Sequence, residues 1–340
     1  MYKRRRLLAV AAALLVIVAV GYGFRGPIRQ ALDIAMGNEY SQQSEETIDF
    51  TISVGEDGSD IAKNLVDAGV TKNFSSTYKV ILARNPIFYP GAYRLHLKMK
   101  TIDVLDALNS SSSLIDTSIL IKEGTRASTI YKMLSDKYGT PLADFEAVTP
   151  SDLGLPAEAV NLDGYLFPAK YHFDPKQSAL SILTTMYKRM KVEIDKAGIA
   201  AGDVHRVLTL ASVVQREGRF TPDFYKISRV FQNRIAIGMA LQSDATVSYA
   251  AGSVSYTTTA AQRAQDNPWN TYKNFGLPIG PISAPGATAI DAALHPAKGS
   301  WIFFCTVNLE TGETEFSTTL AEHERSVAKW RAWMLENPGW

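Results

Sequence analysis

The stretch Leu208-Thr-Leu-Ala-Ser-Val-Val-Gln-Arg-Glu217 decides how the rest of this chain is interpreted. Its apolar residues continue a stripe with the three- and four-residue spacing of one helix face: Val207, Leu210 and Val214. The next position on that stripe is Glu217, so a carboxylate stands where the pattern calls for a core residue. Gly218 follows, and a glycine commonly ends a helix. We therefore expect a helix over 203–217 that ends in a half-buried acid.

The environment predicted for Glu217 favours its protonated form. Removal from water disfavours a charged carboxylate, and the C-terminal end of a helix carries partial negative charge, so both effects should raise the pKa of Glu217. A carboxyl group of this kind is suited to general acid catalysis near neutral pH. The alternative is a Glu217 side chain that turns to solvent or pairs with Arg216 or Arg219, as surface residues commonly do.

Five further motifs stand in a fixed order along the chain. They are Leu162-Asp-Gly-Tyr-Leu-Phe-Pro168, Val230-Phe-Gln-Asn-Arg234, Leu241-Gln-Ser-Asp-Ala-Thr-Val-Ser-Tyr249, Asn270-Thr-Tyr272 and Gly276-Leu-Pro-Ile-Gly-Pro-Ile-Ser283. Together with the Glu217 helix, this ordered set resembles the endolytic murein transglycosylases of the YceG-like (MltG) family. The resemblance runs from about Thr47 to the C-terminus and also includes an N-terminal membrane anchor.

The resemblance implies a reaction that needs only one acid. Cleavage of a glycosidic bond requires protonation of the leaving oxygen, and a hydrolase normally adds a second carboxylate. A lytic transglycosylase instead uses the 6-hydroxyl of the muramic acid, which attacks the anomeric carbon and closes a 1,6-anhydro ring. The resemblance assigns both proton transfers to Glu217. Two residues earlier the chain has Gln215, so this helix offers no rival carboxylate there.

Asp244 is the best candidate for a second acid near the site. We expect it to stabilise positive charge on the sugar ring or to hydrogen-bond a sugar hydroxyl, and the alternative is that it caps a helix over 245–250. By resemblance, the remaining substrate-binding residues carry donors and acceptors suited to sugar hydroxyl and acetamide groups: Gln242, Thr246, Asn270 and Tyr272.

Three more side chains complete the predicted site. Asn233 and Arg234 are expected either to orient the Glu217 helix or to contact the glycan. Tyr165 is expected to stack on a sugar face, with a place in the core as the alternative. The first motif departs from the family at Asp163, where Glu is common, and Phe167-Pro-Ala-Lys170 lacks the acid often found after that proline. These departures bear on substrate contacts more than on the reaction.

The composition of the chain excludes several classes of protein. Its 340 residues suffice for two modest domains, and 20% charged against 46% hydrophobic residues is ordinary for a folded chain. Lys and Arg number 35 against 34 Asp and Glu, so no basic field predicts a nucleic-acid partner. The five histidines are widely separated and the single cysteine lies in an apolar strand pattern, so we expect neither a metal site nor a cofactor.

The N-terminus predicts a membrane anchor. Four basic residues, Lys3-Arg-Arg-Arg6, precede an unbroken apolar run over 7–24 that is just long enough to cross a bilayer as a helix. The basic flank predicts a cytoplasmic tail over 1–6 and a single-pass protein of the cytoplasmic membrane, with the rest of the chain on the outer side. A cleaved signal peptide ending near Ala19-Val-Gly21 is the alternative. Residues 25–46 are expected to be a linker.

The remaining chain is predicted to form two α+β domains. Residues 47–113 resemble a small LysM-like α/β subdomain, a fold associated with glycan binding, and 114–340 form the larger mixed α+β catalytic domain, with the boundary near Ser110-Ser-Ser-Ser113. In the first, Ser59 is expected to cap a helix over 60–68. The expected later helices cover 101–108, 175–198, 221–238 with Thr221 as cap, and 320–335, and a hairpin turn is expected over 309–312.

These observations together lead to one functional hypothesis and two rivals. The hypothesis is an endolytic lytic transglycosylase that cuts the MurNAc–GlcNAc bond within nascent peptidoglycan strands and limits their length, with the penicillin-binding synthases as possible partners. The first rival is a hydrolytic muramidase that uses Glu217 and Asp244. The second is a non-catalytic scaffold that binds peptidoglycan through its LysM-like module.

Overall fold

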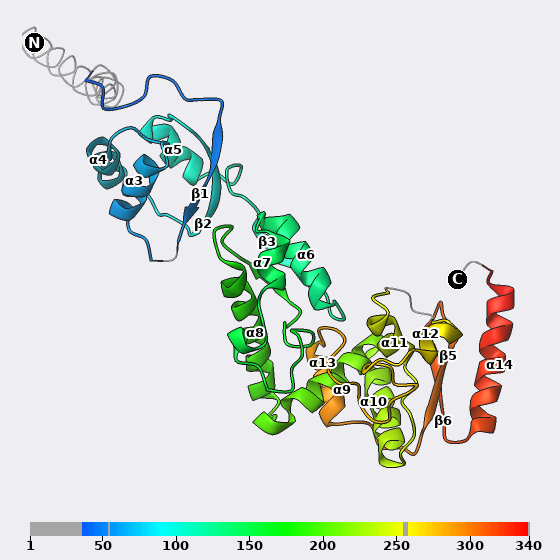
Figure 1. Ribbon diagram of the computed structural model, residues 1–340. Helices are drawn as coiled ribbons and strands as arrows, with labels where there is room; N and C mark the ends of the chain where they lie inside the picture. The colour runs from blue at the N-terminus through cyan, green and yellow to red at the C-terminus, as the bar shows by residue number, and fades with distance from the viewer. Residues whose placement is uncertain (1–35, 54, 254–257, 339–340) are drawn as a thin grey trace, which may run out of the picture. The chain divides into compact units, whose positions relative to one another are not determined.

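The structure is a computed structural model, and it describes residues 36–53, 55–253 and 258–338. The chain divides into two compact units, residues 1–117 and 118–340, which are described separately (Figure 1). The predicted cytoplasmic tail and membrane span, and the first part of the predicted linker, lie outside the described residues.

Among the described residues, no single helix is both long and apolar enough to cross a bilayer. A pair of helices bent by 113° at the break between them, Ala179–Lys196 and Ala201–Glu217, has the length and composition only when taken together.

The first unit pairs two strands with helices between and after them. Its elements are β1 (Thr47–Ile52), α3 (Gly58–Asp67), α4 (Phe74–Arg84), β2 (Gly91–His96) and α5 (Thr101–Leu108). Strands β1 and β2 are antiparallel, with Ile48 opposite Leu95 and Phe50 opposite Tyr93. Because side chains alternate along a strand, Phe50 and Ile52 point to the same face, where both are buried with residues of α3 and α5.

Helix α3 begins at a different cap from the one that the sequence predicted. Asp57 is the N-cap, and its carboxylate accepts hydrogen bonds from the backbone N–H groups of Ser59 at 2.8 Å and Asp60 at 3.0 Å. The Asp60 carboxylate accepts in turn from the N–H of Asp57, which completes a capping box. The assignment of Ser59 as the cap was therefore wrong, because the carboxylate two residues earlier satisfies the free N–H groups.

The second unit is mainly helical and carries two small sheets. Its elements are β3 (Ser118–Leu120), α6 (Ala127–Tyr138), α7 (Leu142–Glu146), β4 (Lys170–His172), α8 (Ala179–Lys196), α9 (Val204–Glu217), α10 (Thr221–Ala236), α11 (Asp244–Ala250), α12 (Ala260–Ala264), α13 (Ala287–Leu294), β5 (Phe303–Asn308), β6 (Glu313–Ser317) and α14 (Leu320–Glu336). Strands β3 and β4 pair antiparallel, and so do β5 and β6. A short 3₁₀ turn at Ala201–Asp203 precedes α9. The helices and the two small sheets of this unit confirm the mixed α+β prediction.

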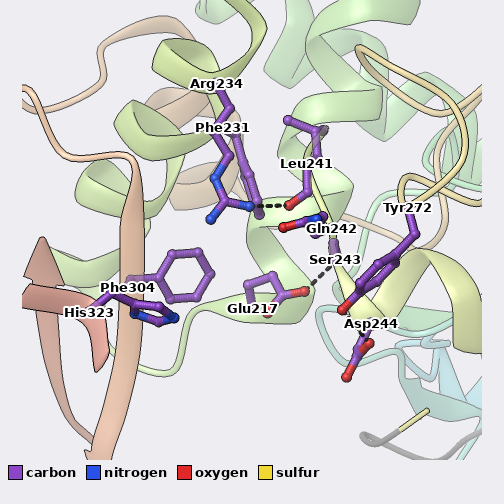
Figure 2. A pocket seen from close by; sticks show the side chains of 10 residues that line it. All are labelled: Glu217, Phe231, Arg234, Leu241, Gln242, Ser243, Asp244, Tyr272, Phe304 and His323. Carbon is purple, nitrogen blue, oxygen red and sulfur yellow. Dashed lines mark hydrogen bonds between the residues drawn. The ribbon is translucent and has the colours of Figure 1, made fainter. Parts of the chain in front are cut away.

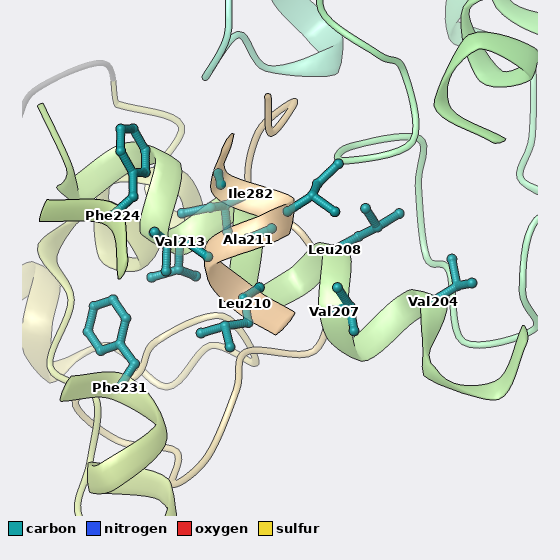
Figure 3. Packing of buried hydrophobic residues seen from close by; sticks show 14 of the residues in the cluster. Val204, Val207, Leu208, Leu210, Ala211, Val213, Phe224, Phe231 and Ile282 are labelled. Carbon is teal, nitrogen blue, oxygen red and sulfur yellow. The ribbon is translucent and has the colours of Figure 1, made fainter. Parts of the chain in front are cut away.

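Helix α9 forms the centre of this unit. Every residue from Val207 to Val214 is buried, so α9 is enclosed on all sides rather than along the single stripe that its apolar spacing predicted. Figure 3 shows the side chains that surround α9. They include Phe224 and Phe231 of α10 and Ile282 from the loop before α13, and α13 itself also packs against α9. Full burial of each such aliphatic side chain contributes roughly 1.5–3 kcal/mol. The end of α9 is therefore held firmly.

The polar residues inside α9 are satisfied locally. Thr209 Oγ1 donates to the carbonyl of His205 at 2.7 Å, and Ser212 Oγ donates to the carbonyl of Thr209 at 2.8 Å. Ser212 Oγ also accepts from the backbone N–H of Ile282 at 3.0 Å. Because buried polar groups are costly without partners, these bonds allow α9 to lie in the core and fix the 282 segment beside it.

The turn from α9 to α10 confirms Gly218 as the residue that ends α9 and corrects the predicted cap of α10. Gly218 ends α9 with φ −84°, so it does not use the left-handed conformation of a glycine cap. A β-carbon at this position would stand 3.2 Å from the ring of Phe224, so the close approach of that ring explains the glycine. Helix α10 starts with Phe220 as N-cap, Thr221 is already its first helical residue, and Pro222 lies in its first turn.

The C-terminal segment forms a hairpin followed by a helix. The turn over 309–312 is as predicted, with Asn308 Oδ1 accepting from the N–H groups of Glu310 and Thr311. Helix α14 then starts at a capping box of Thr319 and Glu322. Helix α14 packs against β5, and β5 contacts α10, so this segment is attached to the same core that holds α9.

Candidate active site

Glu217 is the last residue of α9 and faces a pocket of about 280 Å³. Figure 2 shows the residues that line this pocket, which come from α9, α10, α11, α14, β5 and two loops: Glu217, Phe231, Arg234, Leu241, Gln242, Ser243, Asp244, Tyr272, Phe304 and His323. The residue is half-buried, as its position on the apolar stripe predicted. The alternative in which its side chain turns to solvent is wrong.

The surroundings of Glu217 raise its pKa above the ordinary value. Burial is the largest cause, and the negative charge of Asp244 acts in the same direction. Three weaker influences lower the pKa: the hydrogen bond from Ser243, the backbone N–H of Ala245 and the positive charge of Arg216. Because burial is the largest cause, the net shift is toward the neutral form of Glu217, which is the form that a general acid needs.

Ser243 is the closest partner of the acid, and the sequence analysis missed its role. Its hydroxyl donates to Glu217 Oε1 at 2.5 Å. Ser243 is buried, and its backbone N–H donates to Thr271 Oγ1 at 3.1 Å. This bond fixes the backbone that carries the Ser243 hydroxyl. Ser243 is the N-cap residue of α11, where a serine hydroxyl usually binds the helix's own N–H groups. Here that hydroxyl serves Glu217 instead.

Gln242 reaches the pocket through a strained backbone. Its φ is +50°, a left-handed value that few residues other than glycine adopt. Its N–H donates to the carbonyl of Thr271 at 3.1 Å, which ties the loop to the motif at 270–272. Such a conformation costs on the order of 1–3 kcal/mol and is kept only where its surroundings enforce it. The left-handed residue Gln242 directly precedes Ser243, whose hydroxyl bonds to Glu217.

Asp244 and Tyr272 form the polar side of the pocket. The Tyr272 hydroxyl donates to Asp244 Oδ1 at 2.9 Å, and Thr258 Oγ1 donates to the same oxygen at 2.5 Å. Burial and then Asp244 raise the pKa of Tyr272, so its hydroxyl stays protonated and able to donate. Because Ser243 occupies the N-cap position of α11, the alternative role of Asp244 as that cap is wrong.

Arg234 lines the pocket and also joins it to the C-terminal hairpin. Its Nε donates to the carbonyl of Ile302 at 2.6 Å and its Nη1 to the carbonyl of Leu241 at 2.7 Å. Burial lowers the pKa of Arg234, and the charge of Glu217 opposes that shift. Asn233 donates to the carbonyls of Gly299 and Trp301 at 3.2 Å and 2.9 Å. Both residues thus connect α10 to the chain before β5.

Three predicted glycan-binding residues have their polar groups engaged inside the protein. Thr246 Oγ1 donates to the carbonyl of Ser243 at 2.7 Å. Asn270 Nδ2 donates to the carbonyls of Arg263 and Gln265, and its Oδ1 accepts from the N–H of Tyr272. Tyr165 is fully buried with its hydroxyl 2.7 Å from His205 Nδ1.

In the described part of the chain the pocket lining includes neither these three residues nor Asn233. Thr246 and Asn270 support the loops that carry Ser243 and Tyr272, and Tyr165 belongs to the core around α9. Direct contact of these residues with a glycan stays a prediction.

Asp163, one of the two departures from the pattern that the sequence resembles, has a structural role. Asp163 is buried, and its carboxylate accepts from the N–H of Ala127 and from the hydroxyl of Tyr249, both at 2.7 Å. Burial raises the pKa of Asp163, and these bonds and Arg126 oppose the shift. Asp163 thus holds the start of α6 against α11.

The aromatic side of the pocket was not predicted. It consists of residues from three distant elements, α10, β5 and α14: Phe231, Phe304 and His323. Among the described residues, no group of three His, Cys, Asp or Glu side chains is arranged to hold a metal ion.

The fold and this site define a mixed α+β protein that holds the buried carboxyl group of Glu217 in a pocket lined by hydrogen-bonding side chains. The model of the YceG-like family matches residues 50–329, and the chain belongs to this family.

Curated relatives support the same assignment. An endolytic murein transglycosylase of Bacillus subtilis (strain 168) is 32% identical over 312 residues, which are 85% of this chain and 86% of that protein. An endolytic murein transglycosylase of Streptococcus pneumoniae (strain ATCC BAA-255 / R6) is 26% identical over 317 residues, 91% of this chain, and this chain spans about half (53%) of its length.

A solved structure agrees with the family assignment. The crystal structure of a YceG-like protein from Listeria monocytogenes matches 83% of this chain and 99% of its own, with 32% sequence identity and a TM-score of 0.53.

Proposed function

We propose that this protein is an endolytic lytic transglycosylase that cleaves the MurNAc–GlcNAc bond within nascent peptidoglycan strands and leaves 1,6-anhydro-MurNAc ends. Membership of the YceG-like family and relatives named endolytic murein transglycosylase support this proposal. The observation that carries it is the Glu217 carboxyl group, whose pKa burial raises and which lies in a pocket lined by polar side chains.

The reaction proceeds in two proton transfers through the same side chain. Neutral Glu217 donates its proton to the glycosidic oxygen, the bond from that oxygen to the anomeric carbon breaks, and the ring gains oxocarbenium character. The Glu217 carboxylate then accepts the proton of the muramic acid 6-hydroxyl, whose oxygen forms the new bond to the anomeric carbon. No water is consumed. Ser243, which donates to Glu217 Oε1, stabilises the carboxylate between the two steps.

Asp244 supports this reaction by its charge. Its Oδ1 already accepts from Thr258 and Tyr272, and Arg263 lies 4.0 Å away. Because two hydroxyl donors fix its Oδ1, the Asp244 carboxylate is held in one orientation, where its charge is suited to stabilise a positively charged ring. This arrangement favours the lyase over the hydrolytic muramidase that would use Asp244 as its second carboxylate.

Mass analysis of digested peptidoglycan tests the reaction. The lyase product is lighter by one water than the hydrolase product and has no reducing end. Glu217→Gln is expected to remove this product while the fold persists. Reducing ends from the wild-type protein would support the muramidase. Wild-type protein that binds strands without cutting them, with Glu217→Gln behaving alike, would support the non-catalytic scaffold.

The remaining proposals concern the parts of the chain outside the pocket. The apolar run over 7–24 anchors the protein in the cytoplasmic membrane, with residues 1–6 in the cytoplasm and the folded units outside. The first unit is a LysM-like module that holds glycan, a proposal supported by its two helices between paired antiparallel strands. Penicillin-binding synthases are the partners that would supply new strands. Protease protection in oriented membrane vesicles tests the anchor.

A further inference from the structure

The aromatic side of the pocket has no part in the reaction described above. Phe231 and Phe304 lie edge to face, with ring centroids 5.9 Å apart and an angle of 83°. Figure 2 shows Glu217 between two groups of residues. Phe304 and His323 lie on one side of it, and Asp244 and Tyr272 lie on the other. The hydrogen-bonding side of the pocket is thus separate from an apolar side that carries one imidazole.

The His323 ring is held in a fixed orientation. It stacks on Phe303, with ring centroids 5.0 Å apart and an angle of 14°. The backbone that carries it lies in the first turns of α14, which the reciprocal bonds of Thr319 and Glu322 secure. An imidazole that is stacked on one face and attached to a capped helix presents its nitrogens in a defined direction.

The burial of one ring nitrogen determines which tautomer is favoured. His323 Nδ1 is buried and has no hydrogen-bond partner among the described residues. A buried N–H without an acceptor is rarer and costlier than a buried lone pair, so the proton belongs on Nε2. Burial and the nearby Arg234 charge also lower the pKa of His323, and the charge of Glu324 opposes this shift. The lowered pKa favours the neutral ring. His323 therefore offers a single neutral N–H donor to the pocket.

We propose that His323, Phe304 and Phe231 form a subsite for a sugar acetamide group, in which His323 Nε2–H donates to the acetamide carbonyl oxygen and the phenyl rings contact the acetamide methyl group. This inference rests on the proposed function, because it takes a glycan of N-acetylated sugars as the ligand of the pocket.

The chemistry of this side of the pocket selects an acetamide over the other groups of such a glycan. A carboxylate would lie against the phenyl rings of Phe231 and Phe304, which offer it no hydrogen bond in exchange for its lost hydration. A hydroxyl would leave the phenyl surface of Phe304 against water or a polar group. An acetamide matches both features, since it has a strong neutral acceptor next to an apolar methyl group.

Three glycan substrates separate the hydrogen bond from the methyl contact. Glycan strands freed of stem peptides and de-N-acetylated are used as free amines, after N-formylation, or after re-N-acetylation. The N-formyl group keeps the carbonyl oxygen and lacks the methyl group, whereas the amine lacks both. Release of 1,6-anhydro ends from each strand type gives kcat/KM. Ratios between strand types, measured on one enzyme preparation, are independent of the fraction of protein that is folded.

Four variants accompany the wild type: His323→Leu removes the donor, His323→Gln keeps a neutral N–H donor, Phe304→Leu removes the ring, and His295→Leu, at the C-cap of α13, is a matched control outside the pocket. We expect the wild type to prefer re-N-acetylated over amine strands by about tenfold or more. His323→Leu should lose about tenfold on N-acetyl and N-formyl strands and nothing further on amine strands. His323→Gln should stay within about threefold of wild type, and Phe304→Leu should lose on N-acetyl strands alone.

A His323→Leu variant that keeps the wild-type ratio between N-acetyl and amine strands would overturn the subsite. Failure of the proposed function gives a different result, namely a wild type that releases no anhydro ends from any strand. Equilibrium binding of the three strand types to Glu217→Gln, with and without His323→Leu, then tests the subsite without catalysis. The subsite stands if the His323 change weakens binding of N-acetyl and N-formyl strands but not of amine strands, and it falls if the change affects all three strand types alike.

Discussion

The two sides of the Glu217 pocket differ in how their polar groups are used. On one side the hydroxyls of Ser243 and Tyr272 donate to Glu217 and Asp244, so hydrogen-bonding capacity is spent within the protein. On the other side the buried Nδ1 of His323 has no partner among the described residues, which favours the tautomer whose Nε2–H is the donor proposed for the ligand. The first side is organised to hold charge and move protons, and the second has a donor left for a ligand. This contrast separates chemistry from recognition within one small pocket.

The largest effect is expected from removing the acid of the first side, which we call the chemical side and which holds Glu217, Ser243, Asp244 and Tyr272. Glu217→Gln keeps the shape of the side chain and removes the transferable proton, so release of 1,6-anhydro ends should fall at least about a thousandfold. The raised pKa of Glu217 means that folding favours its neutral form, so stability is lost as pH rises through the folded pKa. The variant should therefore melt no lower than wild type near neutral pH, by calorimetry.

The exposed hairpin residue Glu310 provides the control for this experiment. Glu310→Gln makes the same chemical change at a distance from the pocket and should leave cleavage unchanged. A Glu217→Gln variant that still released anhydro ends at a rate near that of the wild type would remove the acid from the mechanism.

The next largest effect is expected from Asp244→Asn. Loss of the fixed negative charge should lower kcat about a hundredfold, because the charge that develops on the sugar ring is no longer stabilised. Asp244 also raises the pKa of Glu217, so its neutralisation lowers that pKa. Since Glu217 must be protonated to act, the falling limb of the pH profile of kcat/KM should move to lower pH. Anhydro ends should remain the product, and reducing ends from either protein would contradict the role given to Asp244.

Ser243→Ala should have a smaller effect on rate and the opposite effect on the pH profile. The Ser243 hydrogen bond stabilises the Glu217 carboxylate and lowers its pKa, so its loss should raise that pKa. The falling limb of kcat/KM should then move to higher pH, while kcat drops about tenfold. Two neighbouring substitutions that shift one limb in opposite directions would identify Glu217 as the group being titrated. Shifts of the same sign would indicate that another group controls the limb.

The sequence predicts the chemical side of the pocket better than the other side for a physical reason. Helical spacing placed Glu217 on the buried face of its helix, the family resemblance singled out the short motif that carries Gln242 and Asp244, and most helices were found from periodicity within a few residues. Ser243 belongs to the motif at 241–249, but its hydroxyl donates to a residue 26 positions away instead of to its own helix. No local pattern reveals such a contact.

The aromatic side depends on contacts between distant parts of the chain. Phe304 and His323 lie about 90 and 100 residues after the acid, and only the packing of β5 against α10 and of α14 against β5 brings them to the pocket. The enclosure of α9 has the same origin, because the Ile282 segment and α13 arrive from later in the chain. Periodicity identified one face of α9, and tertiary packing buried the others.

The smallest predicted effect tests the link between the two sides. Arg234 bonds both to Leu241, just before the chemical side, and to Ile302, just before β5. Arg234→Lys keeps the charge but offers a single head group in place of a planar fork, so one buried carbonyl loses its partner. We expect the free energy of unfolding to fall by about 1–3 kcal/mol, the melting temperature to fall by a few degrees, and kcat/KM to be three- to tenfold lower.

Arg229→Lys is the matched control, because Arg229 on the same helix donates to Ala297 outside the pocket. It should lose stability similarly and keep kcat/KM. Equal losses of kcat/KM in both variants would mean that Arg234 acts through general stability and does not align the two sides.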